Sequence, residues 1–536
     1  MVRAPEYHER TKHATSDFPD PDLELDFETM PRPLETYRDR PRVSLPGVRS
    51  PVLSALSVVA EADTDPLAGA EQTERDPVDA VTVASLCYWA AGVKHETDHP
   101  TDGTDQPSYY RMASCTGNLH HVEAYVVCGD LDGLDAGVYH FDPATLSLDL
   151  LREGDYRGVL ATATGDRSPE ADGEGSSAAA DASPGVADAP VTVAVTSEWW
   201  RNAWKYRERT YRHAFWDSGT VVSHLLAAAH AFDLPASVVA GFDDSAVADL
   251  LGLDPRTEAP LELVPVGRGT PTGESPSVAP IDVETVPHPP RDRSHDLPHE
   301  AWATSALSDG EAVSAWREQV REALPVGRVG AGDGERVPLD PVDHGTEVAR
   351  PVRSAMERRR SCRSFADELL SRRKLGTVLD RATRGVPGDW TGGGDDAGAP
   401  GLQLNDVYAI ATDVADVPDG RYQFHPEEAA LERLGDATSA DQTRLALGQE
   451  WGGDAHVNVY CMTDVDRVAE ALGDRGYRLA QLEAGVVLGR LYLATYAHRP
   501  LGGTGLTFYD DEVTDFLSPR AEDQTPTTMF AMGVAE

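Results

Sequence analysis

Two segments of the chain share one alternation of hydrophobic and polar residues. They are AYVVCGDLDGLDAGVYHFDPATLSLDLL at 124–151 and VYAIATDVADVPDGRYQFHPEEAALERL at 407–434. Each segment predicts two strands joined by a turn, at Gly137 in the first copy and at Gly420 in the second. The matched residues are 283 positions apart, and this constant separation indicates an internal duplication.

A second pair of segments, 209–234 and 475–501, follows these strands. The sequences RTYRHAFWDSGTVVSHLLAAAHAFDL and RGYRLAQLEAGVVLGRLYLATYAHRPL share Arg, Tyr, Arg and Gly residues 266 positions apart. Apolar residues recur at helical spacing in both, which predicts a long helix in each copy. A short apolar strand ends each copy, LELVPVG first and TMFAMGV last. Because the helices and strands do not alternate regularly, the fold class predicted is α+β.

The repeats divide the chain into two domains, 81–268 and 346–536. A leader, 1–80, precedes them, and a linker, 269–345, with a Pro-rich stretch and one or two helices, joins them. The separation of the copies falls by about 17 residues between the two repeated blocks, which places an insertion in the first copy. Residues 165–190 are rich in Ala, Ser, Gly, Pro and acidic residues and are expected to form a disordered surface loop.

Charge narrows the range of partners. The formal net charge is −43 and the pI is about 4.6. Such a field repels nucleic acid and anionic membranes, so neither is an expected partner. The chain has four lysines, and 43 of its 47 basic residues are arginine. An acidic, lysine-poor composition is typical of proteins from strong brine and predicts a halophilic archaeal source.

The five cysteines form no C-x-x-C pair, which argues against a disulfide framework and a structural zinc site. His120 and His121 do not show metal-ligand spacing with the acidic residues near them, so no metal is expected. The N-terminus has no apolar signal region, and no run of about 18 apolar residues occurs. A cytoplasmic location is therefore expected.

A basic cluster is the first candidate for chemistry. Arg359, Arg360, Ser361 and Arg363 place three guanidinium groups and a hydroxyl within five residues. Arginine forks match phosphate oxygens, and serine adds a neutral donor. The alternative is a solvated basic helix end. Because clustered positive charge runs against the acidity of this chain, we favour a phosphate site.

Two further segments offer close backbone approach and small polar donors. Glycines let a backbone approach a flat ligand, although most glycine clusters are only turns. The second segment, 111–118, suits the polar edge of a heterocycle. An ordinary polar loop before a strand is equally consistent with its sequence. The candidates are Gly502, Gly503, Thr504 and Gly505 in the first segment, and Arg111, Ser114, Gly117 and Asn118 in the second.

Lys205 and Tyr206 are the candidate catalytic residues. They directly precede the repeated block, and the second copy has Ala471 and Leu472 at the matching places. A scaffold role would be expected to persist in both copies, whereas chemistry needs the pair once. Both side chains can transfer protons when burial or neighbours lower their pKa values. The alternative is a surface lysine packed along aromatic residues.

Together these motifs resemble the nitroreductase superfamily and, more narrowly, its SagB-type (thiazole/oxazole oxidase-like) dehydrogenases. R-R-S-x-R-x-F is similar to the superfamily's FMN-phosphate segment. R-x-x-S-x-x-G-N-L-H-x-x-E-A-Y and G-G-T-G are similar to its two segments over the flavin ring. W-K-Y-x-E-R-x-Y-R resembles its active-site stretch, where the Lys-Tyr pair is implicated in azoline oxidation, and the leader's Y-H-E-x-T-K also fits. Each copy lacks motifs that the other retains.

The resemblance implies two fused three-layer nitroreductase-like domains that form an intrachain pseudo-dimer with one FMN. The predicted reaction is hydride transfer between flavin N5 and a small-molecule or peptide substrate, in the azoline-to-azole direction for the SagB type. Two alternatives stay open: an NAD(P)H-dependent nitro- or quinone reductase, and a flavin-less scaffold or partner protein. Further homo-oligomerisation of the chain also stays open.

Overall fold

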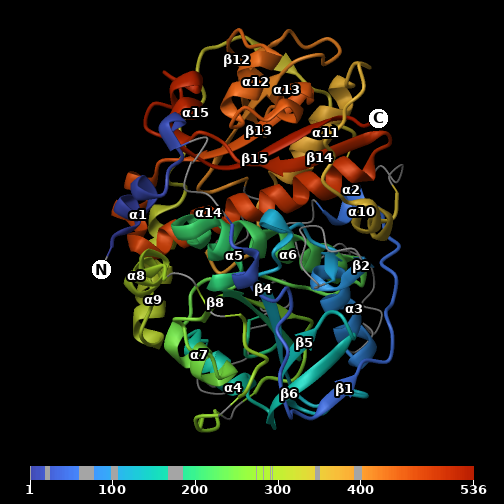
Figure 1. Ribbon diagram of the computed structural model, residues 1–536, viewed down its shortest axis with the longest axis vertical. Coiled ribbons are helices and arrows are strands. Elements are labelled where there is room, and N and C mark those ends of the chain that lie inside the picture. The colour runs from blue at the N-terminus through green and yellow to red at the C-terminus, as the bar shows by residue number, and fades with distance from the viewer. Residues whose placement is uncertain are drawn as a thin grey trace, which may run out of the picture.

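The chain folds into two α+β halves that meet along their longest helices (Figure 1). The predicted α+β class is confirmed. The computed structural model describes residues 2–17, 25–59, 78–97, 107–166, 185–272, 275–281, 283–289, 291, 294–343, 350–390 and 401–536.

The first half is built on an antiparallel six-stranded sheet with the order β1-β6-β5-β4-β7-β8. Its strands are β1 (Arg42–Ser44), β4 (Val122–Cys128), β5 (Gly137–Asp142), β6 (Ser147–Glu153), β7 (Val191–Glu198) and β8 (Glu258–Val266). A separate hairpin consists of β2 (Val93–Thr97) and β3 (Ser108–Arg111). The helices of this half are α3 (Ala80–Ala91), α4 (Arg157–Ala163), α5 (Trp199–Tyr206), α6 (Thr210–Ala231) and α7 (Asp244–Leu251).

The second half is built on an antiparallel seven-stranded sheet with the order β14-β15-β13-β10-β11-β12-β9. Its strands are β9 (Arg336–Pro338), β10 (Asp406–Ala411), β11 (Gly420–His425), β12 (Ala430–Gly435), β13 (Val457–Thr463), β14 (Leu501–Leu506) and β15 (Thr525–Val534). The helices are α10 (Val352–Arg358), α11 (Arg372–Ala382), α12 (Ser439–Leu445), α13 (Glu450–Asp454), α14 (Val465–Ala497, interrupted at Gly473) and α15 (Asp510–Leu517).

The two sheets match in strand order and in register. The order β6-β5-β4-β7-β8 corresponds to β12-β11-β10-β13-β15. Tyr125 lies opposite His140 on the neighbouring strand, and Tyr408 lies opposite Gln423. Both pairs keep the separation of 283 positions found in the sequence. The repeated segments therefore occupy equivalent places in two equivalent sheets.

Helices α6 and α14 cross at a pair of glycines. A Cβ atom on Gly219 would lie 2.4 Å from the carbonyl carbon of Gly485, so only glycine permits this approach. Tyr211 and Tyr477, which are also 266 positions apart, stack across the crossing with ring centroids 6.4 Å apart. One cluster of buried apolar side chains includes residues of both helices, so the core is continuous between the halves.

Each side of this crossing holds a buried carboxylate between two arginines of the opposite half. Asp510 Oδ2 lies 3.0 Å from Arg209 Nη1, and its Oδ1 lies 2.7 Å from Arg212 Nη1. Burial alone would raise the pKa of Asp510, but the two arginines lower it far below its ordinary value. The second cluster repeats the first at positions 266 apart and consists of Asp244, Arg475 and Arg478.

The equivalence extends to the leader and the linker, where no repeat is visible in the sequence. Helix α1 (Ala4–Arg10) packs on α14, and α8 (Asp296–Thr304) packs on α6. The N–H of His13 donates to Asp510 at 2.8 Å, and the N–H of Leu307 donates to Asp244 at 2.9 Å. Since the sequences of α1 and α8 share no pattern, only the contacts reveal that the two segments play the same part.

Parts of the predicted leader and linker belong to the two halves. The predicted leader contributes β1 and the short helix α2 (Ala55–Val58), and the predicted linker contributes α8, α9 (Gly310–Ala323) and β9. The predicted insertion lies largely outside the described residues, but its last part packs against the first half. Val186 and Ala189 there are fully buried, so the insertion ends before them.

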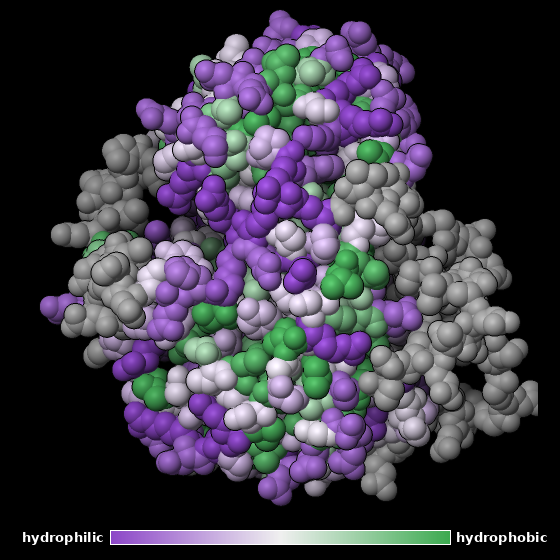
Figure 2. Space-filling model, turned by 90° about the vertical axis from the view of Figure 1, so that its right-hand side faces the viewer, coloured by the Kyte–Doolittle hydropathy of each residue, from purple (hydrophilic) through white to green (hydrophobic). Residues whose placement is uncertain are grey.

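Hydrophilic side chains cover most of the upper part of the face drawn in Figure 2, and apolar ones gather in its lower part, over the first half. Within the described residues, none of the helices combines the length and the apolar character needed to cross a bilayer.

Candidate functional site

Segment 359–365 runs beside strand β14. The N–H of Cys362 donates to the carbonyl of Gly503 at 3.0 Å. A Cβ atom on Gly502 would lie 2.8 Å from Cys362 Sγ, so this glycine gives the segment room. The Gly502–Gly505 stretch is not a turn but an edge strand paired with β15, and its glycines still allow close approach.

Arg359 binds this segment to the loop 111–118 of the other half. Its Nη2 donates to the carbonyls of Arg111 and Ala113 at 2.7 and 3.0 Å, and its Nε donates to that of Met112 at 2.8 Å. The side chain is 8% exposed. We expected the Arg359 guanidinium to bind a phosphate. In the structure it joins its own segment to loop 111–118 instead.

The remaining donors of the segment face solvent. Arg360, Ser361 and Arg363 are exposed, and the Arg363 guanidinium lies 5.1 Å from the ring centroid of Trp451. Within the described part of the chain, neither Arg360 nor Arg363 forms an ion pair with a carboxylate. Exposed guanidinium groups without carboxylate partners are available to bind an anion.

Lys94 of strand β2 is a further cation here, and the sequence analysis did not select it. Its Nζ donates to the carbonyl of Arg359. Burial, reinforced by the nearby Arg359 guanidinium, lowers the pKa of Lys94 to about 7. The scarcity of lysine in this chain was the one sequence signal that could have drawn attention to it.

Loop 111–118 presents its backbone rather than its longer side chains. Arg111 is buried, with Nη1 donating to the Val122 carbonyl at 2.8 Å. Asn118 Nδ2 donates to the Tyr109 carbonyl at 2.9 Å, and the Ser114 carbonyl accepts from Thr220. Gly117 and Asn118 both adopt positive φ and are exposed.

Helix α5 carries Lys205 and Tyr206 to this loop. It begins where the carboxylate of Glu198 accepts backbone N–H groups at its N-terminus, and it ends where Arg207 adopts a φ of +51°. A Cβ atom on Gly117 would lie 2.8 Å from Tyr206 Oη, so this glycine makes room for the phenol. The Nζ of Lys205 lies 5.5 Å from the Tyr206 ring centroid.

The electrostatics of Tyr206 differ from the expectation of a lowered pKa. Burial raises the pKa of Tyr206 above its ordinary value, Asp217 and Cys115 raise it further, and Arg363 opposes them. Burial disfavours the charged form, which for a phenol is the deprotonated one. Tyr206 therefore stays protonated and can donate a hydrogen bond or a proton.

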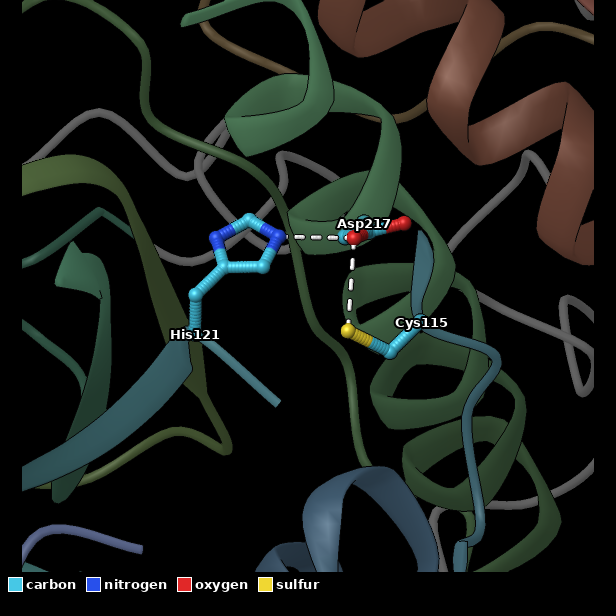
Figure 3. A group of neighbouring side chains, drawn as sticks. All are labelled: Cys115, His121 and Asp217. Atoms are coloured by element: carbon cyan, nitrogen blue, oxygen red, sulfur yellow. Dashed lines mark hydrogen bonds and ion pairs between the residues drawn. The ribbon is translucent and has the colours of Figure 1, made fainter. Parts of the chain in front are cut away.

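A thiol, an imidazole and a carboxylate meet directly beneath the loop (Figure 3). Asp217 Oδ2 lies 2.7 Å from His121 Nε2 and 3.4 Å from Cys115 Sγ. Sequence reasoning missed this cluster because Asp217 lies on α6, about a hundred positions from the other two. Its proximity follows from the packing of α6 beside β4.

The sites predicted from the sequence thus converge in part. Hydrogen bonds and close contacts across both halves link the segment 359–363, strand β14, loop 111–118 and Tyr206. Arg359 and Arg111 lie inside the protein, where they brace the backbone.

Comparison with known proteins identifies part of the chain. Residues 74–268 match the model described as "Nitroreductase family". A protein of Methanocaldococcus jannaschii described as a "putative nitroreductase" is 29% identical over 162 residues, which are 30% of this chain and 80% of that protein. Residues 74–268 form a nitroreductase-family domain.

The fold of the whole chain also has a solved counterpart. A "putative nitroreductase" from Anabaena variabilis matches 99% of both chains with a TM-score of 0.70 and 22% identity, which establishes a shared fold. An E. coli microcin synthetase McbBCD complex, solved with truncated pro-MccB17 bound, matches 50% of this chain and 88% of its own at 19% identity. Its TM-score of 0.28 is too low to bear on the reaction.

Proposed function

We propose that the chain is an FMN-dependent oxidoreductase in which two nitroreductase-like domains, 81–268 and 346–536, form an intrachain pseudo-dimer. The matching strand orders and the paired Asp–Arg clusters support this arrangement. In a two-fold assembly, each contact occurs twice with the partners exchanged, and the clusters follow this rule.

A single composite flavin site is proposed, and the bonds from Arg359 to loop 111–118 are the observation that carries it. They bring the proposed phosphate segment of one domain to the proposed ring segment of the other. The residues present fit FMN, since exposed guanidinium groups and a hydroxyl suit a phosphate, and glycine-rich backbone suits a flat ring. Arg360, Ser361 and Arg363 would bind the phosphate, while Gly503, Thr504, Gly505, Ser114, Gly117 and Asn118 would line the ring.

The proposed reaction is hydride transfer of the SagB type, with azoline-to-azole dehydrogenation as its specific form. When bound, FMN supplies the hydride-exchanging N5. Lys205 would accept the substrate proton, because a lysine amine, unlike an arginine guanidinium, can act as a base once it is neutral. Tyr206, which stays protonated, would orient the substrate by donating a hydrogen bond.

We expect one FMN per full-length chain. The test is to release flavin by denaturing protein purified in high salt, and to compare flavin with protein. Two flavins per chain would contradict a composite site, and none after loading with excess FMN would favour a flavin-less scaffold. Oxidation of NADPH by the loaded protein with a quinone or nitro acceptor would favour the reductase alternative.

Lys94 provides a second test of the phosphate site. Replacing Lys94 with Gln should weaken FMN binding about 10-fold or more, because charge-assisted bonds contribute about 1.5–3 kcal/mol. Binding of riboflavin, which lacks the phosphate, should not change. The measurement is flavin-fluorescence quenching by each protein.

The pH dependence of FMN binding tests the same role of Lys94. An anion favours protonated Lys94, so binding takes up a proton wherever the free amine is neutral. Affinity for FMN should therefore fall as pH rises above about 7, the pKa of Lys94 in the unliganded protein. The Lys94→Gln protein should lose this dependence, and Lys374→Gln, an exposed-lysine control, should keep it. Equal losses for FMN and riboflavin would contradict the assignment.

A further inference from the structure

The cluster beneath loop 111–118 contains three metal-ligand types. The sulfur of Cys115, Nε2 of His121 and a carboxylate oxygen of Asp217 all lie within 4.8 Å of one another. Tetrahedral zinc, with bonds of about 2.0–2.3 Å, holds its ligand atoms about 3.3–3.8 Å apart. Small side-chain adjustments therefore convert the observed spacing into a coordination shell.

Hydrogen bonds from neighbouring groups already orient these ligands. The Nδ1 of His121 lies 2.8 Å from Ser197 Oγ, which leaves Nε2 directed at the carboxylate. Thr116 donates to Asp217 twice, from its hydroxyl to Oδ1 at 2.9 Å and from its backbone N–H to Oδ2 at 2.8 Å, and the N–H of His120 donates to Cys115 Sγ at 3.1 Å. Such outer partners fix ring and carboxylate orientation in metal sites. His121 and Asp217 are both buried, so groups of the protein rather than solvent hold their side chains in place.

The second half of the molecule shows that the fold does not require this cluster. Glu483 matches Asp217 and receives the backbone N–H groups of Gln403, Leu404 and Asn405. Leu404, just before β10, matches His121, just before β4, at the same separation of 283 positions. A carboxylate that holds a loop is thus common to both halves, whereas the imidazole belongs to the first half alone.

A small cavity, lined by both polar and apolar side chains, adjoins the cluster. Its volume is about 10 Å³, and its lining includes Cys115, Asp217, His120 and Arg111. The Nδ1 of His120 and the Nε of Arg111 are buried without a hydrogen-bond partner among the described residues. Buried polar groups of this kind usually face water or a ligand. The space accommodates a single oxygen as a fourth ligand.

We propose that Cys115, His121 and Asp217 bind one divalent cation of the zinc type, with a water in the adjoining cavity as the fourth ligand. A sulfur, nitrogen and oxygen donor set favours Zn²⁺ over Mg²⁺ or Ca²⁺. Binding displaces one proton from the Cys115 thiol and changes no oxidation state. The ion would fix loop 111–118 on α6, and the observations behind this site do not depend on the proposed flavin function.

The test uses full-length protein in high salt. After chelator treatment and removal of the chelator, titration with Co²⁺ should give a thiolate-to-metal charge-transfer band that saturates at one equivalent. Added Zn²⁺ should abolish the band by displacement. Elemental analysis of protein purified without chelator should find one zinc per chain.

Variants distinguish coordination from folding. Cys115→Ser and His121→Leu should both lose the band, and His121→Leu should fold because leucine occupies the matching place in the second half. Ser197→Ala should weaken Co²⁺ binding about 10–100-fold without removing a ligand. Cys128→Ser, which removes a buried thiol in β4, should keep the band. If the parent protein gives no band and retains no zinc, or if His121→Leu retains the band, the proposal is wrong.

Discussion

Replacing Lys205 with arginine is expected to lower turnover about 100-fold or more while FMN stays bound. Arginine keeps the charge and the reach of lysine but remains protonated at every relevant pH, so it cannot accept a substrate proton. The residue lies at the end of α5 beside Tyr206, which itself contacts the glycine of loop 111–118. A role in packing alone would tolerate arginine.

The measurement is single-turnover reduction of bound FMN by an azoline-containing peptide. Flavin content and reduction by dithionite should match the parent, which separates chemistry from cofactor loading. Lys374→Arg serves as the control, because that lysine lies on α11 and donates to the Arg499 carbonyl. Parent-like turnover in Lys205→Arg with full flavin would make the lysine a packing residue. Tyr206→Phe should also slow reduction, by removing the hydrogen-bond donor.

The sequence predicted the fold class and the repeated elements because these depend on local periodicity. The strand pair around Gly137, its counterpart around Gly420 and the helices that follow all occur where the hydrophobic pattern placed them. The equivalence of α1 and α8 could not be predicted, since it rests on contacts with Arg212 and Arg478 and not on similar residues. The contributions of the leader and the linker to the two sheets could not be predicted for the same reason.

The sequence predicted which residues belong to the candidate site better than it predicted what each of them does there. Arg359 belongs to a phosphate-like motif, but its burial beside three carbonyls could be found only from the packing of the two halves. Lys94 and Asp217 were missed because each reaches the site from a distant element. The raised pKa of Tyr206 depends on burial, which composition and spacing do not reveal.

Replacing Asp510 or Asp244 with asparagine is expected to destabilise the protein by about 3–5 kcal/mol. Each carboxylate is fully buried and neutralises two arginines of the opposite half. Asparagine preserves the shape but removes the charge, which leaves two guanidinium groups in the interior without a counterion. The clusters should therefore hold the two halves in register.

Asp511 provides a matched control at the adjacent position. Its side chain is 66% exposed and pairs with Lys12, an arrangement that contributes about 0–1 kcal/mol. Thermal unfolding at one fixed high salt concentration should show a much lower melting temperature for Asp510→Asn and Asp244→Asn than for Asp511→Asn. Because both buried clusters serve the same interface, the two buried variants should resemble each other. Equal melting temperatures for Asp510→Asn and Asp511→Asn would show that the buried pairs do not hold the halves together. The apolar crossing of α6 and α14 alone would then stabilise the interface.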